Sequence, residues 1–459
     1  MKKIILILLA LYSIINCYSQ TSKEHLNKET ANSNLQNQEG TDTFFNDRGL
    51  VKYNLQDYRG AIADYNMAIN INPENSKTYL NRGIAKDHLL DYRGAIVDYN
   101  MAINIYPKYT DAYINRGIAT FELQDYQGAI ESYNKAIEID SNYETIYYNR
   151  GIAKGRLQDY QGAIADYNMA INLYPNFSEA YINKGAAKTE LQDYQGAIEA
   201  YSMAIQIKPN FEIAYNNRGM AKSNLQDYKG AIVDYDMAIR INPNDAETYV
   251  NKGLAKAQLQ DNQGAISNFN KAININSKYT EAYIDRGVVK VGLKNYREAI
   301  VDYNIAIKIN PNYAATYDNR GIAKGELKDY LGAIADFNMA LSINPKLAYT
   351  YNNRGYVKCA LQDYRGAIAD YNVAIEIDPN YVKSYYNRGY VKFELKDYQG
   401  AIADYDMAIE IRPDYVKAYY FRGLAKLLSG QKDGGCLDLS KAGELGYADA
   451  YEAIKKYCN

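Results

Sequence analysis

Histidine and cysteine, which often carry out acid–base, nucleophilic or metal chemistry, are scarce in this sequence. The many aspartates and glutamates fall at fixed repeat positions that favour capping and pairing. The sequence contains two histidines, His25 and His88, and four cysteines that form no Cys-x-x-Cys pair. It has no Gly-x-x-x-x-Gly-Lys-Ser/Thr loop for phosphates and no histidine-rich cluster. We therefore expect no catalytic residue, no metal site and no cofactor. The chain is predicted not to be an enzyme, and His88 is expected to be a solvated side chain.

Charged side chains recur instead at a fixed spacing. Two basic residues stand four positions apart, as in Arg150 and Lys154, where like charges on one helix would repel. An aspartate follows sixteen residues after the first basic residue in nine places. Because aspartates and arginines nearly match in number, we expect ion pairs between two helices; the alternative is an anion-binding stripe for acidic polymers. The nine aspartates are Asp64, Asp98, Asp166, Asp234, Asp302, Asp336, Asp370, Asp404 and Asp438.

A row of asparagines could bind a peptide backbone, because each side-chain amide can donate and accept a hydrogen bond at once. The alternative is that this asparagine is a common polar residue that faces water. The nine members each precede an arginine or lysine: Asn81, Asn115, Asn149, Asn183, Asn217, Asn251, Asn319, Asn353 and Asn387.

All of these residues belong to one repeating unit. The tripeptide Asn-Arg-Gly or a close variant returns every 34 residues, which indicates a solenoid of stacked units. Within a unit, apolar residues at helical spacing predict two helices, and Asp91 is placed to cap the second one. Twelve units fill residues 42–449, beginning at 42, 76, 110, 144, 178, 212, 246, 280, 314, 348, 382 and 416.

The repeat resembles the tetratricopeptide repeat. An aromatic residue, Gly, Ala, an aromatic residue, Ala and Pro stand at repeat positions 4, 8, 20, 24, 27 and 32, as in that family. The resemblance implies an all-α, right-handed superhelical solenoid of twelve helix-turn-helix repeats. It also implies a concave groove lined by first-helix positions 2, 5, 6, 9, 12 and 13. The asparagines occupy position 6, and this row resembles the asparagine ladder in the repeats of O-GlcNAc transferase.

Further groove positions are apolar or aromatic near the C-terminus. Position 9 is apolar in every repeat, and an aromatic patch is expected at Tyr356, Tyr386, Tyr390, Phe393, Tyr420 and Phe421. A last helix within residues 448–459 is expected to cap the array and to cover part of that patch, unless the patch is a partner site. In an oxidising compartment Cys436 and Cys458 are candidates for a disulfide, because the last helix would pack on the helix that carries Cys436; the alternative is that both remain free thiols.

The N-terminal 19 residues read as a secretory leader, with Lys2 and Lys3 before an apolar run. Cleavage after Ser19 would release a soluble protein, whereas cleavage before Cys17 would leave a lipidated membrane tether. Either event predicts export from a bacterial cytoplasm to a periplasmic, secreted or outer-membrane-attached location. Residues 20–41 are almost entirely polar and are predicted to be a disordered linker.

The formal net charge of −2 disfavours a nucleic-acid partner, because such proteins carry a basic surface for phosphates. We predict a non-enzymatic scaffold that binds a protein partner, as a peptide or helix segment, along the groove. The alternative is a structural spacer or assembly factor of an envelope complex that uses its convex face or its ends. Composition and spacing do not indicate the oligomeric state.

Overall fold

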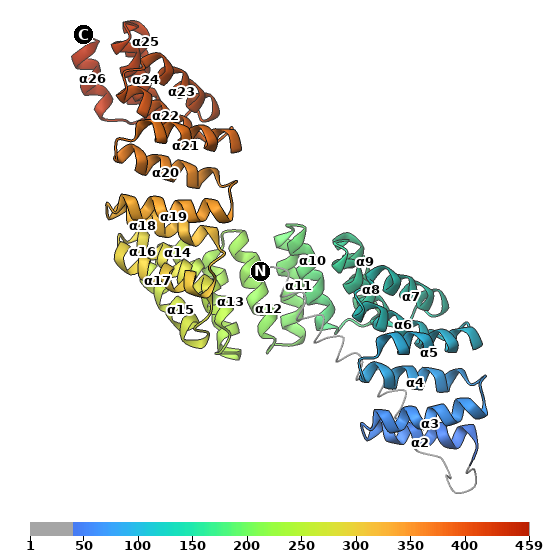
Figure 1. The fold of residues 1–459 in the computed structure, drawn as a ribbon. Helices are drawn as coiled ribbons and strands as arrows, with labels where there is room; N and C mark the ends of the chain where they lie inside the picture. The colour runs from blue at the N-terminus through green and yellow to red at the C-terminus, as the bar shows by residue number, and fades with distance from the viewer. Residues whose placement is uncertain (1–39, 459) are drawn as a thin grey trace. The chain divides into compact units, whose positions relative to one another are not determined.

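The computed structural model describes residues 40–458, which form 25 helices and no strand (Figure 1). Twelve helices of 13 residues are the first helices of the repeats. Their beginnings recur every 34 residues along the chain. These first helices are α2 (Asp42–Asn54), α4 (Ser76–His88), α6 (Thr110–Glu122), α8 (Glu144–Arg156), α10 (Ser178–Glu190), α12 (Glu212–Asn224), α14 (Ala246–Gln258), α16 (Thr280–Gly292), α18 (Ala314–Glu326), α20 (Ala348–Ala360), α22 (Val382–Glu394) and α24 (Val416–Leu428).

A second helix follows each first helix and packs against it, and one further helix, α26 (Asp449–Tyr457), ends the described chain. The prediction of an all-α helical-repeat fold is therefore confirmed. The second helices are α3 (Tyr58–Ile71), α5 (Tyr92–Ile105), α7 (Tyr126–Ile139), α9 (Tyr160–Leu173), α11 (Tyr194–Ile207), α13 (Tyr228–Ile241), α15 (Asn262–Ile275), α17 (Tyr296–Ile309), α19 (Tyr330–Ile343), α21 (Tyr364–Ile377), α23 (Tyr398–Ile411) and α25 (Lys432–Glu444).

The described residues divide into two compact halves, at Pro243 and Asn244. The N-terminal half contains repeats 1–6 (α2 to α13), and the C-terminal half contains repeats 7–12 and α26 (α14 to α26). Within the described part of the chain, no helix is long and apolar enough to cross a membrane.

Local sequence signals set the helix boundaries. The carboxylate of Asp91 accepts a hydrogen bond from the backbone N–H of Gly94 at 3.0 Å, so the predicted N-cap is confirmed. Between the two helices of a repeat, one residue adopts a left-handed backbone conformation, such as Gln158 with a φ of 65°. This conformation disfavours side chains with a Cβ, yet glycine occupies the equivalent position only in repeat 12, at Gly430.

Glycine and a large ring form the centre of the hairpin in repeats 1–11. A Cβ atom at Gly151 would lie only 2.7 Å from Cε1 of Tyr167, so the ring packs directly on the backbone of the first helix. Tyr167 is 3% exposed, and Ala163 and Ala170 beside it are fully buried. The predicted alternation of large and small residues is therefore confirmed, and it explains why the two helices lie so close together.

Buried ion pairs tie the two helices of a repeat to each other. In repeat 4, Arg150 donates to both carboxylate oxygens of Asp166, and Nζ of Lys154 lies 2.8 Å from Oδ2 of the same aspartate. The expected pairing is confirmed, while the expected repulsion between the two basic residues is offset because both bind one carboxylate. Arg150 also donates to Asn134 of the preceding repeat at 2.7 Å, so the cluster links neighbouring repeats as well.

The equivalent cluster in repeat 1 explains how a buried carboxylate remains ionised. At Asp64 burial acts to raise the pKa, but the hydrogen bonds and charges of Arg48 and Lys52 outweigh it and hold the pKa below the usual value. The ionised form is therefore the stable one in the folded protein. The basic residues at these positions serve the fold, which leaves few of them free to bind an acidic polymer.

Within each half, consecutive first helices also contact one another, as α4 does with α6 and α20 does with α22. Consecutive second helices make no comparable contact among the described residues. The first helices therefore lie on the tighter, inner side of the local stack. This arrangement positions first-helix side chains on the inner face of each half.

Candidate binding surface

We call first-helix positions 2, 5, 6, 9, 12 and 13 the groove positions. At position 9 the apolar residues differ in exposure between the two halves. Leu50, Ile84, Ile118 and Ile152 in repeats 1–4 are buried. In repeats 7, 8 and 10 the equivalent Leu254, Val288 and Tyr356 are 41%, 48% and 62% exposed. Position 9 therefore offers apolar surface mainly in the C-terminal half, although it is apolar throughout the sequence.

The asparagines at position 6 are partly or fully buried, and several of them donate side-chain hydrogen bonds to other residues of the protein. Asn149, Asn183 and Asn217 are 4%, 5% and 7% exposed. Asn115 donates to the backbone oxygen of Asp111 on its own helix. Four others donate to position 5 of the preceding repeat: Asn81 to Asn46, Asn183 to Tyr148, Asn353 to Asp318 and Asn387 to Asn352.

These contacts give the asparagine row a structural role, because the donated amide hydrogens join one first helix to the next. Asn251 also has a partner in the structure, and Asn319 is half-buried. A peptide backbone bound at this row would have to use the remaining hydrogen-bonding capacity of each amide. The role of the row in partner binding stays a prediction.

In the C-terminal half, repeat 8 has a charged residue at position 6. Asp285 of repeat 8 stands where nine other repeats have asparagine. Burial, and then the neighbouring Glu281, raise the pKa of Asp285 to about 6. The ionised carboxylate is therefore poorly stabilised by its surroundings at neutral pH.

The predicted aromatic patch is only partly a single cluster. Phe421 at position 6 of repeat 12 brings three of its members together, with ring centroids 6.0 Å from Tyr386, 5.6 Å from Tyr390 and 6.1 Å from Phe393. Another member of the patch, Tyr356, is the most exposed residue at position 9 and belongs to repeat 10, whereas the cluster is formed by repeats 11 and 12. Aromatic rings that pack on each other in this way form a rigid apolar surface.

Beside this cluster lies a pocket of about 370 Å³. Its walls come from four helices and from the turn before α25. Lys432 is the single charged residue in the lining. The lining residues are Phe393 from α22, Leu424, Leu427 and Leu428 from α24, Gly430 and Lys432 around the start of α25, and Tyr457 from the end of α26.

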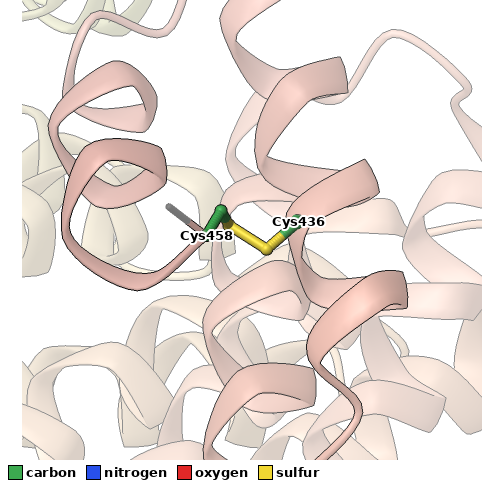
Figure 2. The surroundings of a disulfide bond; sticks show 2 residues. All are labelled: Cys436 and Cys458. Atoms are coloured by element: carbon green, nitrogen blue, oxygen red, sulfur yellow. A yellow bond between two sulfur atoms is a disulfide. The ribbon is translucent and has the colours of Figure 1, made fainter.

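The last helix is held beside this pocket by a disulfide between Cys436 of α25 and Cys458, with Cα atoms 5.8 Å apart (Figure 2). The ring of Tyr447, just before α26, lies 4.7 Å from that of Tyr420. The cap therefore covers one flank of the aromatic region and supplies Tyr457 to the pocket, but Tyr356 stays exposed. The remaining cysteine of the described residues, Cys359, is half-buried and not disulfide-bonded.

His88 is exposed, as expected. Its ring also stacks on Tyr58 with centroids 4.7 Å apart, and its Nε2 lies 2.6 Å from the hydroxyl oxygen of Tyr53. The exposed side chain therefore also joins repeats 1 and 2. His25 and the candidate lipidation residue Cys17 lie outside the described residues. Among residues 40–458, no group of three or more histidine, cysteine or acidic side chains could hold a metal ion.

Part of this surface was predicted from the sequence and part was not. Leu424, Leu427 and Leu428 occupy positions 9, 12 and 13 of repeat 12, which are groove positions named from the sequence. Lys432 and Tyr457 lie outside the groove positions, and no periodicity marks them. Their place in the pocket depends on how α25 and α26 fold back on α24.

Profiles of known families match this chain repeatedly. Profiles described as "TPR repeat" match residues 119–158 and 355–396, and profiles described as "Tetratricopeptide repeat" match residues 146–176, 178–211, 213–245, 246–279, 280–313 and 382–415. Together these matches cover more than half of the chain. No curated protein sequence matches it.

Solved structures with a similar arrangement include the MamA protein, which is 27% identical, covers 38% of this chain and 96% of its own, and has a TM-score of 0.36. Yeast Tom70 is 16% identical over 91% of this chain and 94% of its own, with a TM-score of 0.44. YrrB, described as a TPR protein with an unusual peptide-binding site, is 20% identical over 40% of this chain and 95% of its own, with a TM-score of 0.37. On the evidence of the repeated profile matches and the 34-residue helical hairpins, the chain belongs to the tetratricopeptide repeat family.

Proposed function

We propose that this protein is a non-enzymatic scaffold that binds a protein partner along the groove positions of its C-terminal half. The observation that carries this proposal is the exposure of Leu254, Val288 and Tyr356. They stand at one repeat position that is buried in the first four repeats. Large apolar side chains that are exposed on the same face of neighbouring repeats are typical of protein–protein contact sites.

The stacking of the helices supports the same face. Because consecutive first helices contact one another, their groove positions form a continuous strip over several repeats of a half. A peptide or a helix laid along such a strip could contact several repeats at once. The buried Arg–Lys–Asp clusters hold the hairpins in place, so little ordering of the scaffold would be needed on binding.

We also propose that the protein acts outside the cytoplasm. The support is the leader-like N-terminal segment, with Lys2 and Lys3 before the apolar run from Ile4 to Ile15. The mature protein would then be periplasmic, secreted or attached to the outer membrane through Cys17.

The test compares two triple variants in quantitative partner capture from the native cell-envelope fraction. The first changes the exposed groove residues Leu254, Val288 and Tyr356 to serine. The second is a matched control that changes equally exposed apolar residues of second helices in the same half, Val301, Met339 and Leu437, to serine.

We expect the groove variant to lose partner capture by at least roughly tenfold, because each lost apolar contact costs about 1 kcal/mol or more. The control variant should capture as the parent does, and both should keep their helical content. Loss of capture by the control alone would favour the alternative, a spacer or assembly factor that uses the second-helix face or the ends of the array.

A further inference from the structure

The pocket at the C-terminal end of the array has a chemical character of its own. Its lining combines the rings of Phe393 and Tyr457 with the leucines of α24, and the one charged side chain, Lys432, comes from the first residue of α25. Leu428 and Tyr457 are 54% and 41% exposed, so the pocket is open to a side chain entering from outside. Its volume of about 370 Å³ accommodates one large apolar side chain.

We propose that this pocket anchors a partner segment that presents one large apolar side chain next to a carboxylate, and that the Cys436–Cys458 disulfide is required to build the site. The proposal rests on the scaffold function, since Phe393 and Leu424 occupy groove positions. It adds the chemistry of the ligand at repeats 11 and 12 and a dependence on the redox state of the protein.

The preference for a carboxylate follows from the charge of Lys432. In the repeats with a buried aspartate, the lysine of the first helix is neutralised by that aspartate, as Lys392 is by Asp404 at 2.8 Å. By contrast, no carboxylate among the described residues forms an ion pair with Lys432. An acidic group of a partner that lies beside its apolar anchor would meet this lysine at the pocket wall.

The N-cap of α25 differs from those of most other second helices. In ten of the other second helices an aspartate side chain accepts the backbone N–H of repeat position 19, as Asp397 does from Gly400 at 3.0 Å. At α25 the N-cap residue is Gln431, whose side chain makes no such hydrogen bond, and the carboxylate of the first turn is that of Asp433. Lys432 is the charged residue of this helix start that lines the pocket.

The disulfide determines whether the pocket has its outer wall. Tyr457 directly precedes Cys458, which is bonded to Cys436 of α25 (Figure 2). In α26 only Ala450 and Ala453 are buried, and a nine-residue helix is not stable by itself in water. Further contacts of the cap are a hydrogen bond from the hydroxyl of Tyr451 to the backbone oxygen of Gly443 at 3.1 Å and the ring contact between Tyr447 and Tyr420.

Reduction by a dithiol would break the S–S bond. Cys436 and Cys458 would each gain an electron and a proton to become thiols, while the dithiol would be oxidised to its own disulfide. We expect α26 then to leave its place on α25 and to take Tyr457 with it. The apolar anchor of a partner would lose one wall of its pocket.

The experiment titrates short peptides into the full-length oxidised protein and follows the ¹³C-labelled methyl groups of Leu424, Leu427 and Leu428 by NMR. Three blocked hexapeptides serve as probes: Ser-Gly-Phe-Glu-Gly-Ser, the same peptide with Lys in place of Glu, and the same peptide with Ala in place of Phe. Sodium octanoate is titrated separately as a small-molecule carboxylate.

The Phe–Glu peptide should produce saturable shifts of these methyl signals, and the Phe–Lys peptide should bind roughly threefold to fivefold more weakly, the range expected for one partly exposed ion pair. The Ala–Glu peptide should not saturate. In Lys432→Gln the difference between the Glu and Lys peptides should disappear while the Phe peptides still bind. In Cys458→Ser all binding should be lost while the helical content is kept.

Several outcomes would overturn the proposal. They are no saturable shift with the Phe–Glu peptide, equal binding of the Glu and Lys peptides, unchanged binding by Cys458→Ser, or saturation by octanoate without any by the peptide. The last result would make the pocket a small-molecule site. Partner capture by Lys432→Gln and Cys458→Ser is measured in parallel, so loss of peptide binding with capture retained would reject the pocket and leave the scaffold function standing.

Discussion

The guanidinium of Arg150 holds the buried carboxylate of Asp166 through two hydrogen bonds, from Nε to Oδ2 at 2.9 Å and from Nη2 to Oδ1 at 2.6 Å. The side chain of Asp166 is 4% exposed, and Lys154 contacts the same carboxylate. Such a cluster adds little stability compared with an apolar core, but losing one member leaves a charge unpaired inside the protein. Repeat 3 shows a different solution, because Arg116 there faces Ser132 and Thr120 replaces the lysine.

Asp166→Ser is therefore expected to lower the free energy of unfolding by about 3 kcal/mol, since Arg150 and Lys154 would lose their common anion. The double variant Asp166→Ser with Lys154→Thr, which copies repeat 3, should recover part of that loss. Urea denaturation followed by circular dichroism measures both. Glu138→Ala removes one half of an exposed pair with Lys135 and should leave stability almost unchanged. A double variant no more stable than the single one would show that the unpaired lysine is not the source of the cost.

Two glycines of α8 should respond to alanine in opposite directions. At Gly151 the added methyl group would lie 2.7 Å from the ring of Tyr167, so Gly151→Ala should destabilise the protein by about 2 kcal/mol through overpacking. At Gly155 no atom lies within 4 Å of the added Cβ, so Gly155→Ala should stabilise it by about 0.5–1 kcal/mol through helix propensity. Thermal unfolding of both variants under one condition tests this, and equal effects at the two sites would contradict it.

Asp285→Asn should stabilise the protein at neutral pH. The pKa of Asp285 is raised to about 6 in the folded state, whereas an unfolded aspartate has a pKa of about 3.9. The folded protein therefore binds this proton more tightly, so the contribution of Asp285 to stability falls as the pH rises from about 4 to about 6. The variant should be more stable than the parent by on the order of 1 kcal/mol at pH 7.5, and the difference should shrink at pH 4.5.

The unfolding free energies of Asp285→Asn and the parent are compared at the two pH values. Asp433→Asn, which changes an exposed aspartate of the same half, serves as the control for the substitution itself. A difference that is the same at both pH values would mean that the carboxylate of Asp285 is not destabilised by its burial.

The mature N-terminus of the protein from its native host should distinguish the two processing routes. Cleavage after Ser19 predicts a chain that begins at Gln20, whereas lipoprotein processing predicts an acylated Cys17. Intact-mass and N-terminal peptide mass spectrometry separate these products, because only the second carries the mass of acyl chains. A protein that retains Met1 in the envelope fraction would contradict both routes and the proposed export.

Much of the fold is encoded locally and repeats in the sequence. The contact between Gly151 and the ring of Tyr167 recurs, with Tyr or Phe as the ring, in nearly every repeat. Asp91 caps its helix by accepting a hydrogen bond from the backbone N–H three residues later. Each of these contacts joins residues at a fixed separation, so one repeat describes most of the others. The pairing of Arg150 with Asp166 could be predicted for the same reason, since its spacing of sixteen residues is constant.

The candidate site depended on tertiary structure because exposure is not a property of residue type. Position 9 is apolar in every repeat, yet Ile118 is 4% exposed and Tyr356 is 62% exposed. Their difference comes from the side chains that neighbouring repeats place against them. Likewise, no period in the sequence marks Lys432 or Tyr457, which meet at one pocket only because α26 folds back and is bonded to α25. The sequence by itself thus determined the repeating hairpin, whereas the packing between repeats and at the C-terminal end decided which side chains remain available to a partner.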